Sequence, residues 1–382
     1  MKKKILFVND VLSVGGVERS LVDCLNHLDY ERLSVDLYIL HPEYDLLDQI
    51  NKKVKMIYVK EQRCKLSVKY LWLYIWMKLL HVLSFQKAED GVKVGLRNEY
   101  RRNMKKHFFP KYYDYAVAYK HSETAEFVIE VIGAEQKILF YHHGEIMDYE
   151  LHQRLFQAAD KIVAVSDGVA AMLSKAYPAF KDKITVIRNL IDPDVIRRRA
   201  KEYKAETVQG KAILCSCGRL HPEKGFDLAV AAAKVLSDRG IDFHWYFVGD
   251  GLEHKLLEER IETLGLKGKI TITGMLINPN PYLDACDIYV QPSYTEAFCL
   301  SIAEAQVLRK PVISTATIGA KQLIEDGITG ILTESNGVSI GNAIYQLLMN
   351  KDKRLELIDN TGNIDYNKSM LEYHFSWQSI IQ

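Results

Sequence analysis

The segment Gly218–Gly225 combines two cations with the backbone freedom of glycine. Arg219 and Lys224 stand five residues apart inside it, directly after the apolar run Ile213–Cys217. A guanidinium supplies a planar fork of donors and an ammonium a compact charge, so the two can converge on one diphosphate. Because sheets of alternating strands and helices bind ligands beyond the carboxyl ends of their strands, we expect a phosphate site here rather than two solvated surface cations.

Two glutamates flank the start of a second candidate helix. Glu296 precedes the helix expected over Leu300–Leu308, and Glu304 lies within it. Their carboxylates can accept hydrogen bonds from sugar hydroxyls. The backbone N–H groups that can bind a phosphate at this helix start belong to Phe298, Cys299, Leu300 and Ser301. Glutamates eight residues apart are common in structural roles, so this pattern matters only in combination with the first.

A glycine pair follows the first apolar run of the chain. Gly15 and Gly16 come after Ile5–Val8 and before a helix expected over Glu18–Leu28. Glycine lets the backbone approach a ligand closely, and the following helix start offers free N–H groups to a phosphate. A simple turn explains such a pair equally well.

Short apolar runs alternate with helical patterns along both halves of the chain. The runs are nearly continuous rather than alternating in polarity, which indicates burial on both faces and therefore parallel sheets. The expected strands are Ile5–Val8, Val35–Leu40, Val54–Val59, Tyr115–Ala118, Ile138–Tyr141, Ile162–Val165, Ile184–Ile187, Ile213–Cys217, Trp245–Val248, Ile270–Thr273, Ile288–Gln291 and Val312–Ser314. The sequence predicts an α/β fold with two doubly wound, Rossmann-like domains.

The domain boundary is predicted near Asn189–Pro193, where a strand ends and two aspartates flank a proline. The first domain would comprise residues 1–190 together with a C-terminal helix of about residues 366–382. The second would comprise residues 191–365.

Composition excludes several classes of protein. Of the 382 residues, 48% are hydrophobic and 26% charged, which is typical of a globular protein. A net charge of +1 gives no reason to expect a nucleic-acid partner. The six cysteines are scattered without the clustering that zinc needs, so we expect unpaired thiols in a reducing compartment. Only four apolar residues follow the N-terminal lysines, too few for a secretory signal, and we expect a cytoplasmic protein.

The segment from Arg63 to Lys106 departs from this balanced background. It holds eleven basic residues against three acidic ones, and within it Tyr70–Met77 is a run of eight bulky apolar residues. The run is too short to span a bilayer. Aromatic residues beside cations suit an anionic membrane surface, but a packed core helix with a solvated basic face shows the same pattern. Both interpretations stay open.

Taken together, the motifs resemble family 4 of the glycosyltransferases, the retaining, nucleotide-sugar-dependent enzymes with the GT-B fold. The residues that carry the resemblance are Gly15–Arg19, Val163–Ser166, Asn189–Asp192, Gly218–Gly225, Val248–Gly251, Glu296–Glu304 and Gly327–Gly330. The resemblance implies two Rossmann-like domains facing a central cleft, with the acceptor on the first and the donor on the second. It is weakest across residues 61–111.

The resemblance also implies a role for individual residues. Arg219 and Lys224 would hold the donor diphosphate, Glu304 the ribose hydroxyls, and Glu296 the transferred sugar. The histidine beside the reacting sugar would be His143, with His142 as the alternative. The implied catalytic set is His143, Arg219, Lys224 and Glu296. The implied donor-binding set is Gly16, Arg219, Lys224, Gly249, Met275, Glu296, Phe298, Cys299, Leu300, Ser301 and Glu304.

Two departures from the family pattern concern the same region. Ala297 and Cys299 stand where glycines are usual, which puts the geometry of the phosphate loop in doubt, and Gln322 stands where a glutamate is common.

The activity implied is transfer of a sugar, from a donor that is UDP-linked by default, to a glycan or lipid-linked acceptor in cell-surface polysaccharide biosynthesis. No cofactor is implied. A sugar-nucleotide epimerase of the same fold and a non-catalytic sugar-nucleotide-binding partner are the alternatives. A dehydrogenase is excluded because His254 occupies the last glycine position of the dinucleotide motif that starts at Gly249. Asp192-Pro193-Asp194 has the form of a metal-binding DxD motif, but its place at the domain joint favours a hinge, and we expect no metal.

Overall fold

The protein is described here from a computed structural model that covers residues 2–58, 68–82, 86–109 and 111–381. Within its helices, the side chains at 68, 79–82, 86–91, 94 and 107 are not described. Contacts divide the chain into two compact units. The first comprises residues 1–12, 25–141 and 148–163, and the second comprises residues 13–24, 142–147 and 164–382.

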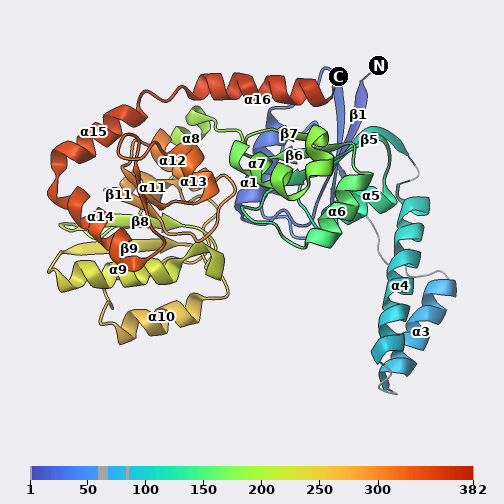
Figure 1. Cartoon of the computed structure of the whole chain (residues 1–382), viewed down its shortest axis with the longest axis horizontal. Helices are drawn as coiled ribbons and strands as arrows, with labels where there is room; N and C mark the ends of the chain where they lie inside the picture. Colours follow the sequence, from blue (N-terminus) through green and yellow to red (C-terminus); the bar gives the residue numbers. More distant parts are fainter. Residues whose placement is uncertain (1, 59–67, 83–85, 110, 382) are drawn as a thin grey trace. The chain divides into compact units, whose positions relative to one another are not determined.

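A seven-stranded sheet is formed by the first part of the chain (Figure 1). Its strands are β1 (Lys3–Asn9), β2 (Leu33–Ile39), β3 (Lys55–Ile57), β4 (Tyr112–Ala118), β5 (Gly133–Tyr141), β6 (Lys161–Ala164) and β7 (Ile184–Val186). They lie in the order β3-β2-β1-β4-β5-β6-β7. The strand β1 pairs in parallel with β2, Ile5 opposite Val35, and with β4, Ile5 opposite Tyr115. The order reverses direction at β1, as a doubly wound sheet requires.

A six-stranded sheet repeats the scheme in the second unit. Its strands are β8 (Ala212–Cys217), β9 (Phe243–Val248), β10 (Ile270–Ile272), β11 (Ile288–Gln291), β12 (Val312–Thr315) and β13 (Ile331–Thr333). They lie in the order β10-β9-β8-β11-β12-β13, and all the pairs are parallel. The prediction of an α/β fold with two parallel sheets is confirmed.

Both faces of the second sheet are covered by helices, which explains why its strands read as continuous apolar runs. On β9, Phe243, Trp245 and Phe247 enter one core cluster, whereas Tyr246 and Val248 enter another. The first cluster includes residues of α9, α10, α14 and α15, and the second includes residues of α11, α12 and α13. Alternate residues of one strand therefore pack into two separate cores.

Helices follow most of the strands, and the last three, α14, α15 and α16, come after the final strand β13. Those of the first part are α1 (Gly16–Asn26), α3 (Val68–Val82), α4 (Gln86–His107), α5 (Glu123–Val131), α6 (Tyr149–Ala158), α7 (Asp167–Ala176) and α8 (Pro193–Arg199). Those of the second part are α9 (Phe226–Asp238), α10 (His254–Thr263), α11 (Asn280–Ala285), α12 (Leu300–Val307), α13 (Ile318–Leu323), α14 (Gly337–Met349), α15 (Lys351–Thr361) and α16 (Tyr366–Ile380). Among the helices that are described, none has both the length and the apolar character needed to cross a bilayer.

The strand predictions agree closely with the structure, except that β13 was not anticipated and that Val59, the end of one predicted strand, lies outside the described residues. Along the chain, the strands of the first sheet all precede the predicted boundary at residue 190, and those of the second sheet all follow it. The contact-based units divide the chain differently, because residues 164–190 and the helix α16 fall in the second unit. The prediction that α16 belongs to the first domain stays a prediction.

Candidate functional site

The second sheet changes winding direction between β8 and β11, and two of the predicted motifs follow these two strands. The loop Gly218–Gly225 leaves β8, and the loop Pro292–Cys299 leaves β11. Gly225 adopts a left-handed conformation with φ of 63°, and a Cβ there would collide with the carbonyl oxygen of Pro292. Only glycine lets the two loops pack this closely. The loops therefore meet at the point where sheets of this kind bind ligands.

Lys224 and Glu296 form a largely buried ion pair between these loops. The ammonium nitrogen of Lys224 lies 2.8 Å from Oε1 of Glu296. The hydroxyl of Ser293 donates to the same oxygen at 2.8 Å, and the Nε2 of Gln291 lies 2.8 Å from that hydroxyl. Burial by itself favours loss of the ammonium proton, but the Glu296 carboxylate outweighs it and raises the pKa of Lys224. A fixed positive charge thus stands at the carboxyl end of β8.

Arg19 and Glu304 form a second pair in the second unit. Nη1 of Arg19 lies 3.6 Å from Oε1 of Glu304, and both side chains are largely buried. The guanidinium also donates to the backbone carbonyl of Ile277. Burial and then the nearby Glu304 carboxylate raise the pKa of the Cys217 thiol, at the end of β8, to about 12. Glu304 therefore faces the same strand end as the first pair.

His143 contacts Glu223, the residue before Lys224. Nδ1 of His143 accepts a hydrogen bond from the backbone N–H of Glu145, so Nε2 carries the proton toward Glu223, 3.5 Å away. The hydrogen bond from His143, assisted by the charge of Lys224, lowers the pKa of Glu223 to about 2. The backbone of Gly144 packs against the Glu296 loop, since a Cβ there would lie 2.6 Å from Oγ1 of Thr295. The predicted histidine therefore lies beside the predicted carboxylate loop.

The start of α12 takes a conformation that favours glycine. Cys299 precedes the helix with φ of 72° and ψ of 79°, although it is not glycine. Its thiol and the Phe298 side chain are buried, and Leu300 and Ser301 begin the helix half-buried. The first N–H groups of a helix have no acceptor within it. Cys299 thus adopts a backbone conformation that costs strain in a residue other than glycine.

The remaining predicted residues, which take no part in the two ion pairs above, are Arg219, Gly16, Gly249, Met275 and His142. Arg219 is exposed, and across the described part of the chain its guanidinium forms no ion pair or hydrogen bond. Gly16 is the first residue of α1, with open space where a Cβ would stand. Gly249 follows β9 and bridges to Gly274, next to the exposed Met275. His142 is half-buried beside His143.

In the DxD-like motif Asp192-Pro193-Asp194, the first aspartate caps a helix. The carboxylate of Asp192 caps α8 by accepting from the backbone N–H groups of Asp194 and Val195. No group of three or more metal-ligating side chains is found in the described ranges. Gln322, the other departure from the family pattern, accepts from the backbone N–H of Asp167.

Sequence reasoning missed two partners in these pairs. Arg19 was noted only as part of the glycine motif, yet it lies one turn after Gly16 on α1, where its side chain shares a face with that glycine. Glu223 precedes Lys224 and could have been noted as the acid within a cationic loop. Nothing in the sequence links Arg19 to Glu304.

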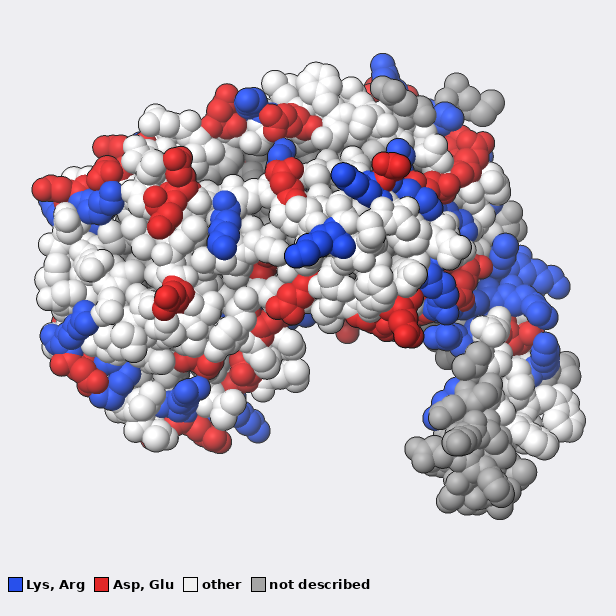
Figure 2. Space-filling model, in the orientation of Figure 1, with Lys and Arg blue, Asp and Glu red and all other residues white. Residues whose placement is uncertain are grey.

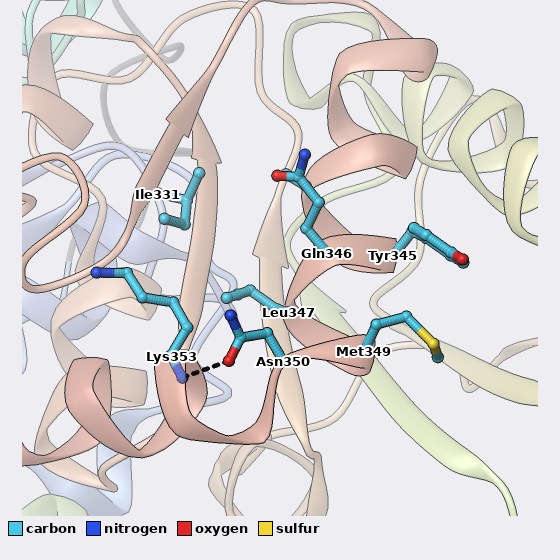
Figure 3. Close-up of a pocket in the computed structure, with 8 residues that line it drawn as sticks. Ile331, Tyr345, Gln346, Leu347, Met349, Asn350 and Lys353 are labelled. Carbon is cyan, nitrogen blue, oxygen red and sulfur yellow. Dashed lines mark hydrogen bonds between the residues drawn. The ribbon is translucent and has the colours of Figure 1, made fainter.

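A separate hollow of about 490 Å³ lies between β13, α14 and the start of α15. Figure 3 shows Ile331, Leu347, Gln346 and Lys353 around it, with Asn350 accepting from the backbone N–H of Lys353. It is lined by one cation and no acidic side chain. No predicted site residue lines it, and its groups offer no convergent chemistry.

Comparisons with known proteins point to one family. Residues 198–363 match the family described as glycosyl transferases group 1. The alpha-D-kanosaminyltransferase of Streptomyces kanamyceticus is 29% identical over 183 residues, which are 47% of this chain and 47% of that protein. The lipopolysaccharide core biosynthesis glycosyltransferase LpsE of Rhizobium meliloti is 26% identical over 213 residues, 56% of this chain and 61% of that protein. The matched region spans about half the length of these curated relatives.

The structural comparison concerns the whole fold. The crystal structure of Anabaena Alr3699/HepE in complex with UDP-glucose matches with a TM-score of 0.71, covering 99% of this chain and 100% of that one at 20% identity. This likeness confirms the predicted two-sheet α/β fold of the GT-B type. The similarity to the glycosyl transferases group 1 thus lies in residues 198–363, which hold the loops after β8 and β11.

Proposed function

We propose that the protein is a retaining glycosyltransferase that moves a hexosyl group from a UDP-sugar to a glycan or lipid-linked acceptor in cell-surface polysaccharide biosynthesis. The observation that carries the proposal is the ion pair of Lys224 and Glu296, which joins the loops after β8 and β11 at 2.8 Å. A cation for a diphosphate and a carboxylate for a sugar stand together where such sheets bind nucleotides.

The names of relatives support the finer parts of the proposal. HepE was solved with UDP-glucose, which supports a UDP-linked donor. LpsE acts in lipopolysaccharide core biosynthesis, which supports a cell-surface glycan as the acceptor. The place of action in the cytoplasm stays a prediction from cysteine usage.

The donor diphosphate is held in this proposal by Lys224 and Arg219. Lys224 is already fixed by Glu296, whereas Arg219 is exposed and able to turn toward a ligand. The N–H groups at the start of α12 contribute a partial positive charge to the same phosphates. Both cations then stabilise the negative charge that grows on the leaving diphosphate as its bond to the sugar breaks.

The sugar is oriented by the two glutamates and by His143. Glu296 accepts from hydroxyls of the transferred sugar, and Glu304, oriented by Arg19, accepts from the ribose hydroxyls. The acceptor hydroxyl attacks from the face that the diphosphate leaves, and its proton passes to the departing phosphate oxygen. No side-chain base is required, and the product retains the configuration of the donor.

Product analysis with UDP-glucose, UDP-galactose, UDP-N-acetylglucosamine and a lipid extract distinguishes the three candidate functions. A transferase releases UDP and forms a glycosylated product, an epimerase forms an isomerised UDP-sugar, and a non-catalytic binder forms neither. The anomeric configuration of the product, read by NMR, tests retention. An inverted product contradicts the mechanism, and an isomerised donor contradicts the proposed function.

The double variant R219A/K224A tests the assigned cations. Loss of one charge-stabilising donor costs about 10²–10³ in rate, so the double variant should lose at least that factor in turnover. The matched control is Lys234→Ala on α9, a lysine of the same domain that pairs with Asp238 at the surface. Unchanged turnover in R219A/K224A would refute the assignment of both cations.

A further inference from the structure

The helix α3 exposes an apolar face to solvent. Leu71, Trp72, Ile75 and Trp76 are all exposed, Trp72 at 67% and Trp76 at 54%. At 100° per residue these four side chains occupy a sector of about 140° on one side of the helix. Figure 2 shows white side chains over α3, beside blue ones at the adjoining end of α4. Large apolar side chains gathered in this way mark an interaction surface.

The opposite side of α3 is covered by α4. Leu73 lies over Gly95 of α4, where a Cβ would stand 3.6 Å from Cδ2 of the leucine. Lys69 links the same two helices by an ion pair with Glu99, at 3.6 Å. The helix α4 is in turn joined to α5, where Arg101 contacts Glu126 at 3.2 Å. The exposed face of α3 is therefore presented outward by a supported pair of helices (Figure 1).

Lysines border the apolar face on both sides. On the helical wheel Lys69 lies just beyond Trp76, and Lys78 lies just beyond Leu71. The ammonium of Lys78 also sits over the ring of Tyr74, 5.8 Å from its centre. Lysines at such margins keep their charges in water while their stems cover apolar surface, and Trp and Tyr favour the boundary between lipid and water.

The charge of the two helices points to an anionic partner. The exposed charged side chains described on them are Lys69, Lys78, Lys93, Arg97, Arg102, Lys105 and Lys106. Glu99, the acidic residue described there, is buried. The cations Arg63, Lys65 and Lys87 and the acidic residues Glu89 and Asp90 of the same segment lie outside the described side chains. A second copy would bring the same positive charge to its own face, and lysine is depleted from the cores of protein interfaces.

We propose that α3 docks this protein onto an anionic lipid bilayer, lying in the interface with Leu71, Trp72, Ile75 and Trp76 inserted among the acyl chains. At 1.5 Å per residue its 15 residues span about 22 Å, less than the roughly 30 Å core of a bilayer, so the helix lies on the membrane and does not cross it. Acidic headgroups contact the lysines at its margins.

The two exposed tryptophans make the contact directly observable. Of the four tryptophans, Trp245 and Trp377 are buried. Binding of the full chain to vesicles of phosphatidylglycerol and phosphatidylcholine should shift the tryptophan emission to the blue, and brominated acyl chains should quench it. The variant W72S/W76S should show neither change. Absence of quenching in the wild type at low salt would overturn the proposal.

Flotation with the same vesicles tests which residues carry the binding. L71S/I75S should reduce binding about tenfold or more, and each of Lys69→Gln and Lys78→Gln about fivefold. The matched control is L371S/F375S, two similarly exposed residues of α16, which should bind as the wild type does. Binding that is equal in all variants, or equal on pure phosphatidylcholine, contradicts the proposal. Self-association that L71S/I75S abolishes, without any vesicle binding, shows a second copy as the partner instead.

Discussion

Replacing Lys224 by methionine should destabilise the second unit by about 3 kcal/mol. The side chains of Lys224 and Glu296 are only 19% and 11% exposed, and their charged atoms are 2.8 Å apart. Removing one partner of a fully buried pair costs about 3–5 kcal/mol, because the other charge is left uncompensated. The hydroxyl of Ser293 still donates to Glu296 in the variant, so the lower end of that range is expected.

The double-mutant cycle separates the pair from its surroundings. K224M/E296Q leaves no uncompensated charge, so it should cost about 2 kcal/mol less than the sum of the single variants. Urea unfolding of the full chain, followed through the buried Trp245 of the second sheet, measures each free energy. Lys234→Met, which breaks an exposed pair on α9, is the control and should cost less than about 1 kcal/mol.

Two results would refute this reasoning. Lys224→Met could prove no more costly than Lys234→Met, in which case the pair is effectively solvated. The single variants could also prove additive, in which case Lys224 and Glu296 are not coupled. The same variants test binding separately. A lost charge-assisted hydrogen bond of about 1.5–3 kcal/mol should weaken UDP binding about 10- to 100-fold in Lys224→Met, whereas Lys234→Met should bind UDP as the wild type does.

Three other perturbations have defined signs. The contact with His143 lowers the pKa of Glu223 to about 2, so the stabilisation by Glu223 is present above the unfolded pKa of 4.5 and is lost as the pH falls toward 2. Urea unfolding should therefore show that the difference in free energy of unfolding between the wild type and Glu223→Gln shrinks by about 2 kcal/mol between pH 7 and pH 2.5. Arg19→Gln should raise the KM for the UDP-sugar about tenfold with a smaller change in kcat, since Arg19 orients Glu304 and does not contact the reacting atoms; an equal loss in kcat would contradict this role. Cys299→Gly should be no less stable in urea than Cys299→Ala, although it removes one more carbon, because glycine relieves about 1 kcal/mol of left-handed backbone strain. A clearly lower free energy of unfolding for the glycine variant would show that the strain is absent.

The parts of the fold that sequence predicted are those with a local cause. A strand buried on both faces is largely apolar, so runs such as Trp245–Val248 are visible without any partner. The strand β13 was missed because Ile331–Thr333 is only three residues long, lies at the edge of its sheet and is half-buried. The loop glycine Gly225 was visible, but its collision partner Pro292 was not, because that contact joins segments 67 residues apart.

The site shows the same distinction between local and distant causes. Lys224 and Glu296 could be placed at the ends of two strands, and adjacency followed once the strand order put β8 beside β11. No strand order allows the pairing of Arg19 with Glu304 to be inferred, since it depends on where the first turn of α1 lies in the second unit. The identity of Cys299 put the geometry of the phosphate loop in doubt, and the backbone there adopts the left-handed conformation that glycine favours, with the strain that this entails. The residue type alone did not predict that Cys299 would adopt this left-handed conformation.

The helix α3 shows how a neighbouring helix can supply a polar side that its own sequence lacks. An isolated helix at a membrane needs a polar face opposite its apolar side. The charges of α3 define no such face. In the structure α4 takes the place of that polar face, with Gly95 against Leu73 and Glu99 against Lys69. The two helices together are amphipathic, although α3 alone is not. Hence the lack of a polar face within α3 itself does not contradict a bilayer contact, and the exposure of Trp72 becomes the observation to test.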